Sequence, residues 1–191
     1  MKKLFIAVSI ALLSACSAPQ QQQVNFTPQA VMSNSDIVTN SKFTLVSKDV
    51  RSAQYVALVD SGHNNIEPVH ARQNVRIALE NALASQFDSQ GFTITVNSEN
   101  TITLEIQESL VTVTQSALEN EMKGKVLIQL TAETPKGKLV KSYTGTANRT
   151  SAFSASTQEI EQVLNDVINL VLKDIANDAE LQNYMKERFH D

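Results

Sequence analysis

Apolar and polar positions follow two different periods along this chain. Every second residue is apolar in "TITLEIQ" and in "GKVLIQLTAE", an alternation typical of β-strands with one buried face. A change of phase near 108–110 predicts a bulge or bend in the first of these strands. Pro68 and the preceding "SGHNN" indicate a loop. The strands expected from alternation and from shorter β-prone runs cover 42–47, 54–60, 101–113, 124–133 and 139–146.

Two other segments place apolar residues at spacings of three and four, which predicts amphipathic helices. The first contains Val75 to Phe87 and is expected to end before Gly91, whose freedom at positive φ suits the position after a helix. The second follows a capping-box pattern formed by Ser156 and Glu159, and its apolar stripe continues to residue 175. A short last helix is expected over 181–189.

Polar residues facing outward from neighbouring strands favour an antiparallel sheet with one covered face, and two amphipathic helices are available to cover it. The predicted fold class is therefore α+β, with two layers: a mainly antiparallel β-sheet and two amphipathic helices packed on one face. The chain has 191 residues, of which 42% are hydrophobic, so we expect a single domain over 41–191.

The amino-terminal residues have the pattern of a lipoprotein signal peptide, expected over 1–15. Lys2 and Lys3 precede an apolar run that is too short to span a bilayer. The run ends in "LSAC", which resembles a bacterial lipobox, in which small residues precede a cysteine that is acylated before cleavage. Cys16 is the single cysteine of the chain. We therefore expect Cys16 to carry diacylglycerol and an amide-linked acyl chain such as palmitate, and to be neither a redox group nor a metal ligand.

Membrane attachment through the acyl chains on Cys16 predicts an envelope location, because more than one acyl chain is needed for stable anchoring. Ser17 stands where an aspartate would resemble an inner-membrane retention signal, so the periplasmic face of the outer membrane is favoured. The following residues are rich in Gln, Ser, Asn and Pro. This composition predicts a lipidated, flexible tether over 16–40 that holds the domain away from the membrane.

Charge and motifs exclude several classes of function. The chain has 16 basic and 20 acidic residues, a formal charge of −4 that becomes −6 once Lys2 and Lys3 are removed with the leader, so nucleic acid is not an expected partner. His63, His70 and His190 lack the spacing of a zinc site, and no phosphate-binding glycine loop is present. We predict no metal, no cofactor, no catalytic residues and no enzymatic activity.

Two small groups of residues are candidate sites. Asp49 and Arg51, two positions apart on an extended chain, share a face and are predicted to form a structural pair. Tyr184, Met185 and Phe189 near the carboxyl terminus are predicted to form either an interaction surface or part of the core.

Several short motifs together are similar to those of the YajG-type bacterial lipoprotein family. They follow the lipobox in order, as D-x-R at 49–51, "QGF" at 90–92, "GKLVKSY" at 137–143, "AFSAS" at 152–156 and "DAELQNY" at 178–184. The resemblance implies an envelope lipoprotein without an established activity, and it transfers no catalytic residue.

The function expected from these observations is that of a lipid-anchored envelope lipoprotein whose non-catalytic periplasmic domain binds or scaffolds an envelope protein. One alternative is a carrier of an apolar ligand such as a lipid, held between the sheet and the helices. A cell-wall hydrolase, with two carboxylates facing one cleft, is the third hypothesis.

Overall fold

The computed structural model describes residues 22–39, 41–62, 65–152 and 154–189. The predicted signal peptide, Cys16 and the first part of the predicted tether lie outside them, as do His63 and His190. In chain order the elements are β1 (Gln23–Val24), β2 (Lys42–Asp49), β3 (Tyr55–Asp60), β4 (Ile66–Ala71), α1 (Val75–Ser89), β5 (Thr93–Ile94), β6 (Thr101–Gln115), β7 (Glu119–Thr134), β8 (Gly137–Ala152), α2 (Thr157–Ala176) and α3 (Ala179–Arg188).

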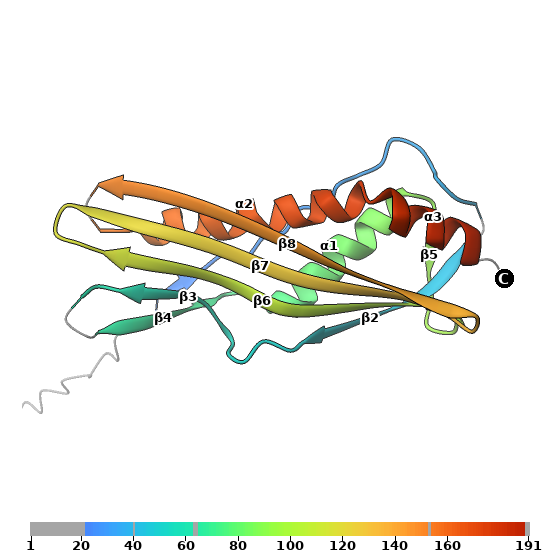
Figure 1. Ribbon diagram of the computed structural model, residues 1–191, viewed down its shortest axis with the longest axis horizontal. Coiled ribbons are helices and arrows are strands. Elements are labelled where there is room, and N and C mark those ends of the chain that lie inside the picture. Colours follow the sequence, from blue (N-terminus) through green and yellow to red (C-terminus); the bar gives the residue numbers. More distant parts are fainter. Residues whose placement is uncertain (1–21, 40, 63–64, 153, 190–191) are drawn as a thin grey trace, which may run out of the picture.

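One curled sheet of eight strands and a layer of helices on one of its faces make up the fold (Figure 1). The predicted α+β class with helices on one side is confirmed. Three long antiparallel strands, β6, β7 and β8, form the greater part of the sheet. The other five strands are short and most of them pair in parallel, so the sheet is mixed.

Two strands placed end to end pair with the edge of β6 that is opposite β7. β2 pairs in parallel with its first half, from Thr101 to Ile106, and β3 pairs in parallel with its second half, from Val111 to Thr114. β6 changes neighbours at the position where the apolar phase shifts. The predicted bulge is present there, because the register with β7 shifts between Ile106 and Glu108.

β4 forms where the sequence indicated a loop. It pairs antiparallel with β3, and β1 covers its outer edge only at His70 and Ala71. Pro68 therefore lies on a part of β4 with no outer neighbour among the described strands, a position at which proline is tolerated.

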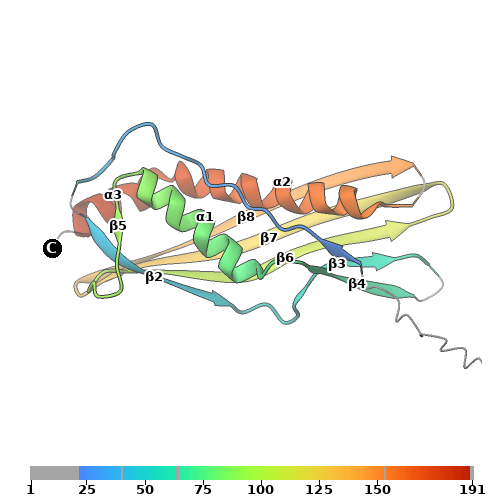
Figure 2. The same cartoon turned by 180° about the vertical axis from the view of Figure 1, so that it is seen from behind.

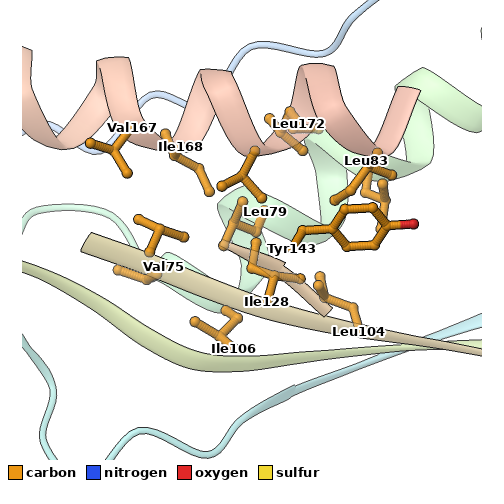
Figure 3. Packing of buried hydrophobic residues seen from close by; sticks show 14 of the residues in the cluster. Val75, Leu79, Leu83, Leu104, Ile106, Ile128, Tyr143, Val167, Ile168 and Leu172 are labelled. Carbon is orange, nitrogen blue, oxygen red and sulfur yellow. The ribbon is translucent and has the colours of Figure 1, made fainter. Parts of the chain in front are cut away.

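The core lies between the sheet and two helices. The apolar stripe of α2 packs over β6, β7 and β8, and α1 packs over β2 (Figure 3). Gly124 and Gly145 allow α2 to approach the strands closely: a Cβ atom at Gly124 would lie 2.8 Å from Val163 Cγ1, and one at Gly145 would lie 2.7 Å from Val171 Cγ2. These two positions require glycine because α2 lies too close to the strands to leave room for a Cβ atom.

The helix ends agree with the sequence prediction. The Ser156 side chain caps α2 by accepting from the Glu159 N–H, and the Glu159 carboxylate accepts from the Ser156 N–H, as a capping box requires. Gly91 follows α1 with a φ of 92°. A Cβ atom there would lie 2.4 Å from the carbonyl oxygen of Val38, so this close contact also needs glycine.

The segment before β2 packs on the domain, which differs from the tether predicted up to residue 40. Figure 2 shows it running along the helical layer from β1 to the start of β2. Val24, Phe26 and Val38 are buried. Because these apolar residues are isolated in a polar stretch, they show no periodicity, yet each fills a place in the core. The folded domain thus begins at β1 rather than at residue 41.

Candidate functional site

Asp49 and Arg51 lie together at the position where β6 exchanges β2 for β3. Arg51 Nε donates to Asp49 Oδ1 at 2.9 Å and Arg51 Nη2 donates to Asp49 Oδ2 at 2.8 Å, so the contact is bidentate. Arg51 Nη1 donates to the carbonyl oxygens of Tyr55 and Ser109 at 3.3 and 3.4 Å. The guanidinium thus bridges β2, the start of β3 and the bulged part of β6.

The electrostatics of this pair follow from its burial. The side chains of Arg51 and Asp49 are only 5% and 12% exposed. Burial by itself raises the pKa of Asp49, but the hydrogen bonds and positive charge of Arg51 outweigh it and hold this pKa below the usual value. An ion pair that also contacts the backbone of the neighbouring strands is suited to holding those strands in place.

The carboxyl-terminal candidates divide between core and surface. Met185 and Phe189 are fully buried, and Phe189 packs against the ring of Phe43. These two residues therefore belong to the core and do not form an interaction surface, because other parts of the domain cover their side chains. Tyr184 is partly buried and its hydroxyl donates to the carbonyl oxygen of Gly137 at 2.8 Å. Tyr184 links α3 to the β7–β8 turn.

Asp178, which the sequence marked only as the first residue of the "DAELQNY" motif, is a structural residue. Its Oδ1 accepts from the N–H groups of Glu180 and Leu181 and so caps α3. Its Oδ2 accepts from the Tyr143 hydroxyl at 2.9 Å and pairs with Lys141 Nζ at 3.1 Å. Burial raises the pKa of Asp178, but these hydrogen bonds and the Lys141 charge outweigh it and lower the pKa below its usual value. Burial, with the hydrogen bond to Asp178, raises the pKa of Tyr143.

The outer edge of β8 is open. Within the described chain β8 pairs only with β7, through a ladder of sixteen residue pairs without a register shift. Every second residue of such a strand directs its N–H and C=O away from its partner. The exposed residues along β8 are Gly137, Lys138, Val140, Ser142, Thr144, Thr146, Asn148, Arg149, Thr150 and Ala152.

Several cavities open on the surface of the described residues, and four of them bear on function. The first of these, of about 810 Å³, lies at the end of the molecule that holds α3 and the β7–β8 turn and is lined mainly by polar residues. Two glutamates, Glu99 and Glu187, contribute to it together with Lys136 and Arg188, and all four are exposed. Two smaller cavities share Arg51, and one of these also contains His70. None of the four is lined by the apolar stripe of α2.

Two further features bear on the function classes. In the described part of the chain, no group of three or more His, Cys, Asp and Glu side chains is placed to hold a metal ion. No helix in that part is both long and apolar enough to cross a membrane.

Comparison with known proteins gives one family and one fold. The family profile described as "Uncharacterized lipoprotein" matches residues 28–186. The uncharacterized lipoprotein YajG of Escherichia coli K12 is 23% identical over 188 residues, which cover 97% of each chain, and YajG of strain CFT073 matches equally. The crystal structure of a Xanthomonas campestris DUF330 protein is similar in fold, with a TM-score of 0.57 and 12% identity over 86% of this chain and 99% of that chain.

Proposed function

The chain belongs to a family of uncharacterized lipoproteins, and from this premise we propose that it is anchored in the outer membrane through acylated Cys16 and that its periplasmic domain binds another envelope protein along β8. The family membership confirms the resemblance to YajG-type lipoproteins. The proposed domain is a binding module and carries out no reaction.

The open edge of β8 is the observation that carries the proposal. Proteins protect long edge strands with proline, bulges or charged side chains, because an unprotected edge pairs with other strands. Between residues 139 and 150, β8 contains neither proline nor a bulge. Of its three cations, Lys141 pairs with Asp178 and Glu180, and Arg149 donates to Gln162. The third, Lys138, is exposed beside the β7–β8 turn, at one end of this edge.

An extended segment of a partner can therefore add to β8 as a further strand. Main-chain hydrogen bonds supply much of the affinity in this mode of recognition, and side chains on alternate positions supply the specificity. From Val140 to Thr146 the exposed positions of β8 are small and neutral, three of them hydroxylated, with Val140 as the one aliphatic side chain. The exposed cations Lys138 and Arg149 lie nearer the two ends of the strand. The middle of the edge therefore accommodates a partner strand without charge selection against it.

The proposal of a non-catalytic module is supported by the polar cavity. A glycoside hydrolase needs two carboxyl groups with different environments, one of them in surroundings that keep it protonated. Glu99 and Glu187 both lie exposed to solvent, beside the cations Lys136 and Arg188. The test is turnover of purified peptidoglycan: release of fragments that is lost in Glu99→Gln or Glu187→Gln would establish a hydrolase.

The carrier hypothesis receives no support from the packing. An apolar ligand would need space under the α2 stripe, where Val163, Val167 and Val171 instead contact the strands at glycine positions. Delipidated protein that binds a fluorescent fatty acid in proportion to its concentration would restore this hypothesis.

Site-specific photocrosslinking in cells tests the proposed edge. A photoreactive residue at Thr144 on β8 should give a discrete adduct with a heavier envelope protein. The matched control is Thr131 on β7. This strand lies between β6 and β8, and Thr131 is paired with Thr103 on one side and with Val140 on the other, so no partner strand can add there. Val140→Lys and Thr146→Lys together should abolish the Thr144 adduct while leaving the melting temperature unchanged, because both positions are exposed.

Three results would contradict the proposal. The first is an equal yield of adducts at Thr144 and Thr131. The second is an adduct that persists after both lysine substitutions. The third is an adduct of twice the chain's mass, which would identify a second copy of the chain, rather than another protein, as the partner. Separately, intact mass of the membrane-extracted protein tests acylation of Cys16, and density separation of the two membranes tests the location.

A further inference from the structure

A cavity of about 270 Å³ opens where β4, the start of α1 and the segment between β2 and β3 meet. The residues that line it are Arg51, Gln54, His70, Ala71 and residues 72–75. β7 and β6 separate β8 from the strands around this cavity, so it is distinct from the proposed docking edge.

Three basic side chains line this cavity, and none of the described residues that line it is acidic. Arg51 is paired with Asp49, so its charge is compensated by that carboxylate. Arg72 and His70 differ from it, because within the described residues neither side chain takes part in an ion pair or a hydrogen bond. The first turn of α1 adds no acidic residue. The cavity therefore has an uncompensated positive charge from Arg72, and His70 adds a second one when it is protonated.

The amide side chains beside Arg72 present hydrogen-bond donors to the cavity. Asn74 Oδ1 accepts from the Ile77 N–H at 3.1 Å, and Gln73 Oε1 accepts from the Phe26 N–H at 2.8 Å. Because each amide oxygen is bound to the backbone, the NH₂ group is the part of the side chain that remains for a ligand. Three successive side chains, those of residues 72–74, therefore offer N–H donors at one wall of the cavity.

From the charge of this cavity and its donors we infer that it binds the phosphate group of a ligand. A phosphate group presents several strong acceptor oxygens in different directions, so it can accept from Arg72, His70 and the two amides together. A carboxylate presents two oxygens in one plane and would leave some of these donors unpaired. The cavity is smaller than the pockets of about 300–1,000 Å³ that hold drug-sized ligands. It therefore fits a phosphate group and a small part of the molecule that carries it.

The cavity lined by Glu99 and Glu187 provides a contrast within the same molecule. Lys136 and Arg188 also line it, so its two cations lie beside two carboxylates and their charge is compensated. That cavity does not favour an anion. Arg188 is therefore the matched control for Arg72, because both are exposed arginines and only the second lines a cavity without acidic residues.

Calorimetric titration of the full-length protein in a non-ionic detergent tests the site. Inorganic phosphate is added at constant ionic strength, and saturable binding of one phosphate per chain is expected. Arg72→Gln should weaken this binding by about tenfold, the loss expected for one hydrogen bond between charged groups, and His70→Ala should weaken it as well. Arg188→Gln should bind phosphate as the unchanged protein does. The melting temperature of each variant without phosphate shows that it is folded.

A second ligand distinguishes the two sources of a phosphate group. Glycerophosphoglycerol is the soluble headgroup of phosphatidylglycerol, and binding tighter than that of inorganic phosphate would support the site and identify a lipid headgroup as its ligand. The reverse order would support the site and identify free phosphate. Absence of saturable binding, equal weakening in Arg72→Gln and Arg188→Gln, or acetate that binds as tightly as phosphate would overturn the inference. Crosslinking at Thr144 is independent of these results, so the proposed docking edge is tested separately.

Discussion

Arg51 and Asp49 form a bidentate ion pair, buried at the gap between two strands that share one edge of β6. The end of β2 and the start of β3 border this gap, and the Arg51 guanidinium also donates to the backbone carbonyls of Tyr55 on β3 and Ser109 on β6. The pair therefore links β2 and β3, the two strands that pair with the same edge of β6. This arrangement supports the structural role proposed for it.

Arg51→Ala should lower the free energy of unfolding by about 3 kcal/mol, because it leaves the Asp49 carboxylate buried without its partner. Urea denaturation followed by circular dichroism measures the change. Lys48→Ala is the matched control, since Lys48 pairs with Glu105 on the exposed face and should contribute less than about 1 kcal/mol. An Arg51→Ala protein that melts normally yet loses its envelope phenotype would show that Arg51 binds a ligand.

Gly145→Ala should destabilise the protein by about 1–3 kcal/mol through overpacking of α2 against β8. The added methyl group would meet Val171 Cγ2 at 2.7 Å and the Val167 carbonyl oxygen at 3.0 Å. Gly124→Ala should cost less, because its nearest contacts are the ends of two valine side chains, which can rotate. Thermal unfolding of both variants, with Thr144→Ala as an exposed control, checks this order; the reverse order would contradict it.

Acid should unfold the protein in part through Asp178 and Asp49. Both carboxyl groups have a lowered pKa in the folded state, so their contribution to stability is complete above the unfolded pKa of about 4 and is lost as the pH falls through the lower, folded values. Stability measured in urea should therefore decline steadily below pH 4. Asp178→Asn should be less stable at pH 7 and should show a smaller decline. An unchanged acid slope in this variant would exclude Asp178 as a contributor.

Asn165→Ala should loosen the segment that precedes β2. The Asn165 side chain accepts from the Thr27 N–H at 2.8 Å and donates to the Asn25 carbonyl at 3.0 Å. Its loss removes two hydrogen bonds, each contributing about 1 kcal/mol. Hydrogen exchange of amides 25–31 should accelerate, whereas Asp166→Ala, an exposed neighbour on α2, should leave it unchanged. Unaltered exchange in Asn165→Ala would mean that the buried Val24 and Phe26 hold the segment without these bonds.

Local pattern was sufficient for a large part of the fold. The two long helices, the capping box at Ser156, the glycine after α1 and the alternating strands β6 and β7 are all visible in the sequence, because each depends on residues within a few positions of one another. The bulge in β6 was also predictable, since a bulge changes the phase of alternation. The membership of a lipoprotein family followed from ordered short motifs.

Tertiary structure alone decided how distant segments pair. The sequence by itself could not assign β2 and β3 to the same edge of β6, because parallel pairing depends on contacts between residues far apart in the chain. Val24 and Phe26 have no periodic neighbours to mark them as core, and the local sequence around Met185 and Phe189 does not show whether these side chains lie in the core or on the surface. Periodicity can be read from the sequence because it depends on residues a few positions apart. Burial of an isolated residue depends on contacts with distant segments, so only the tertiary structure decides it.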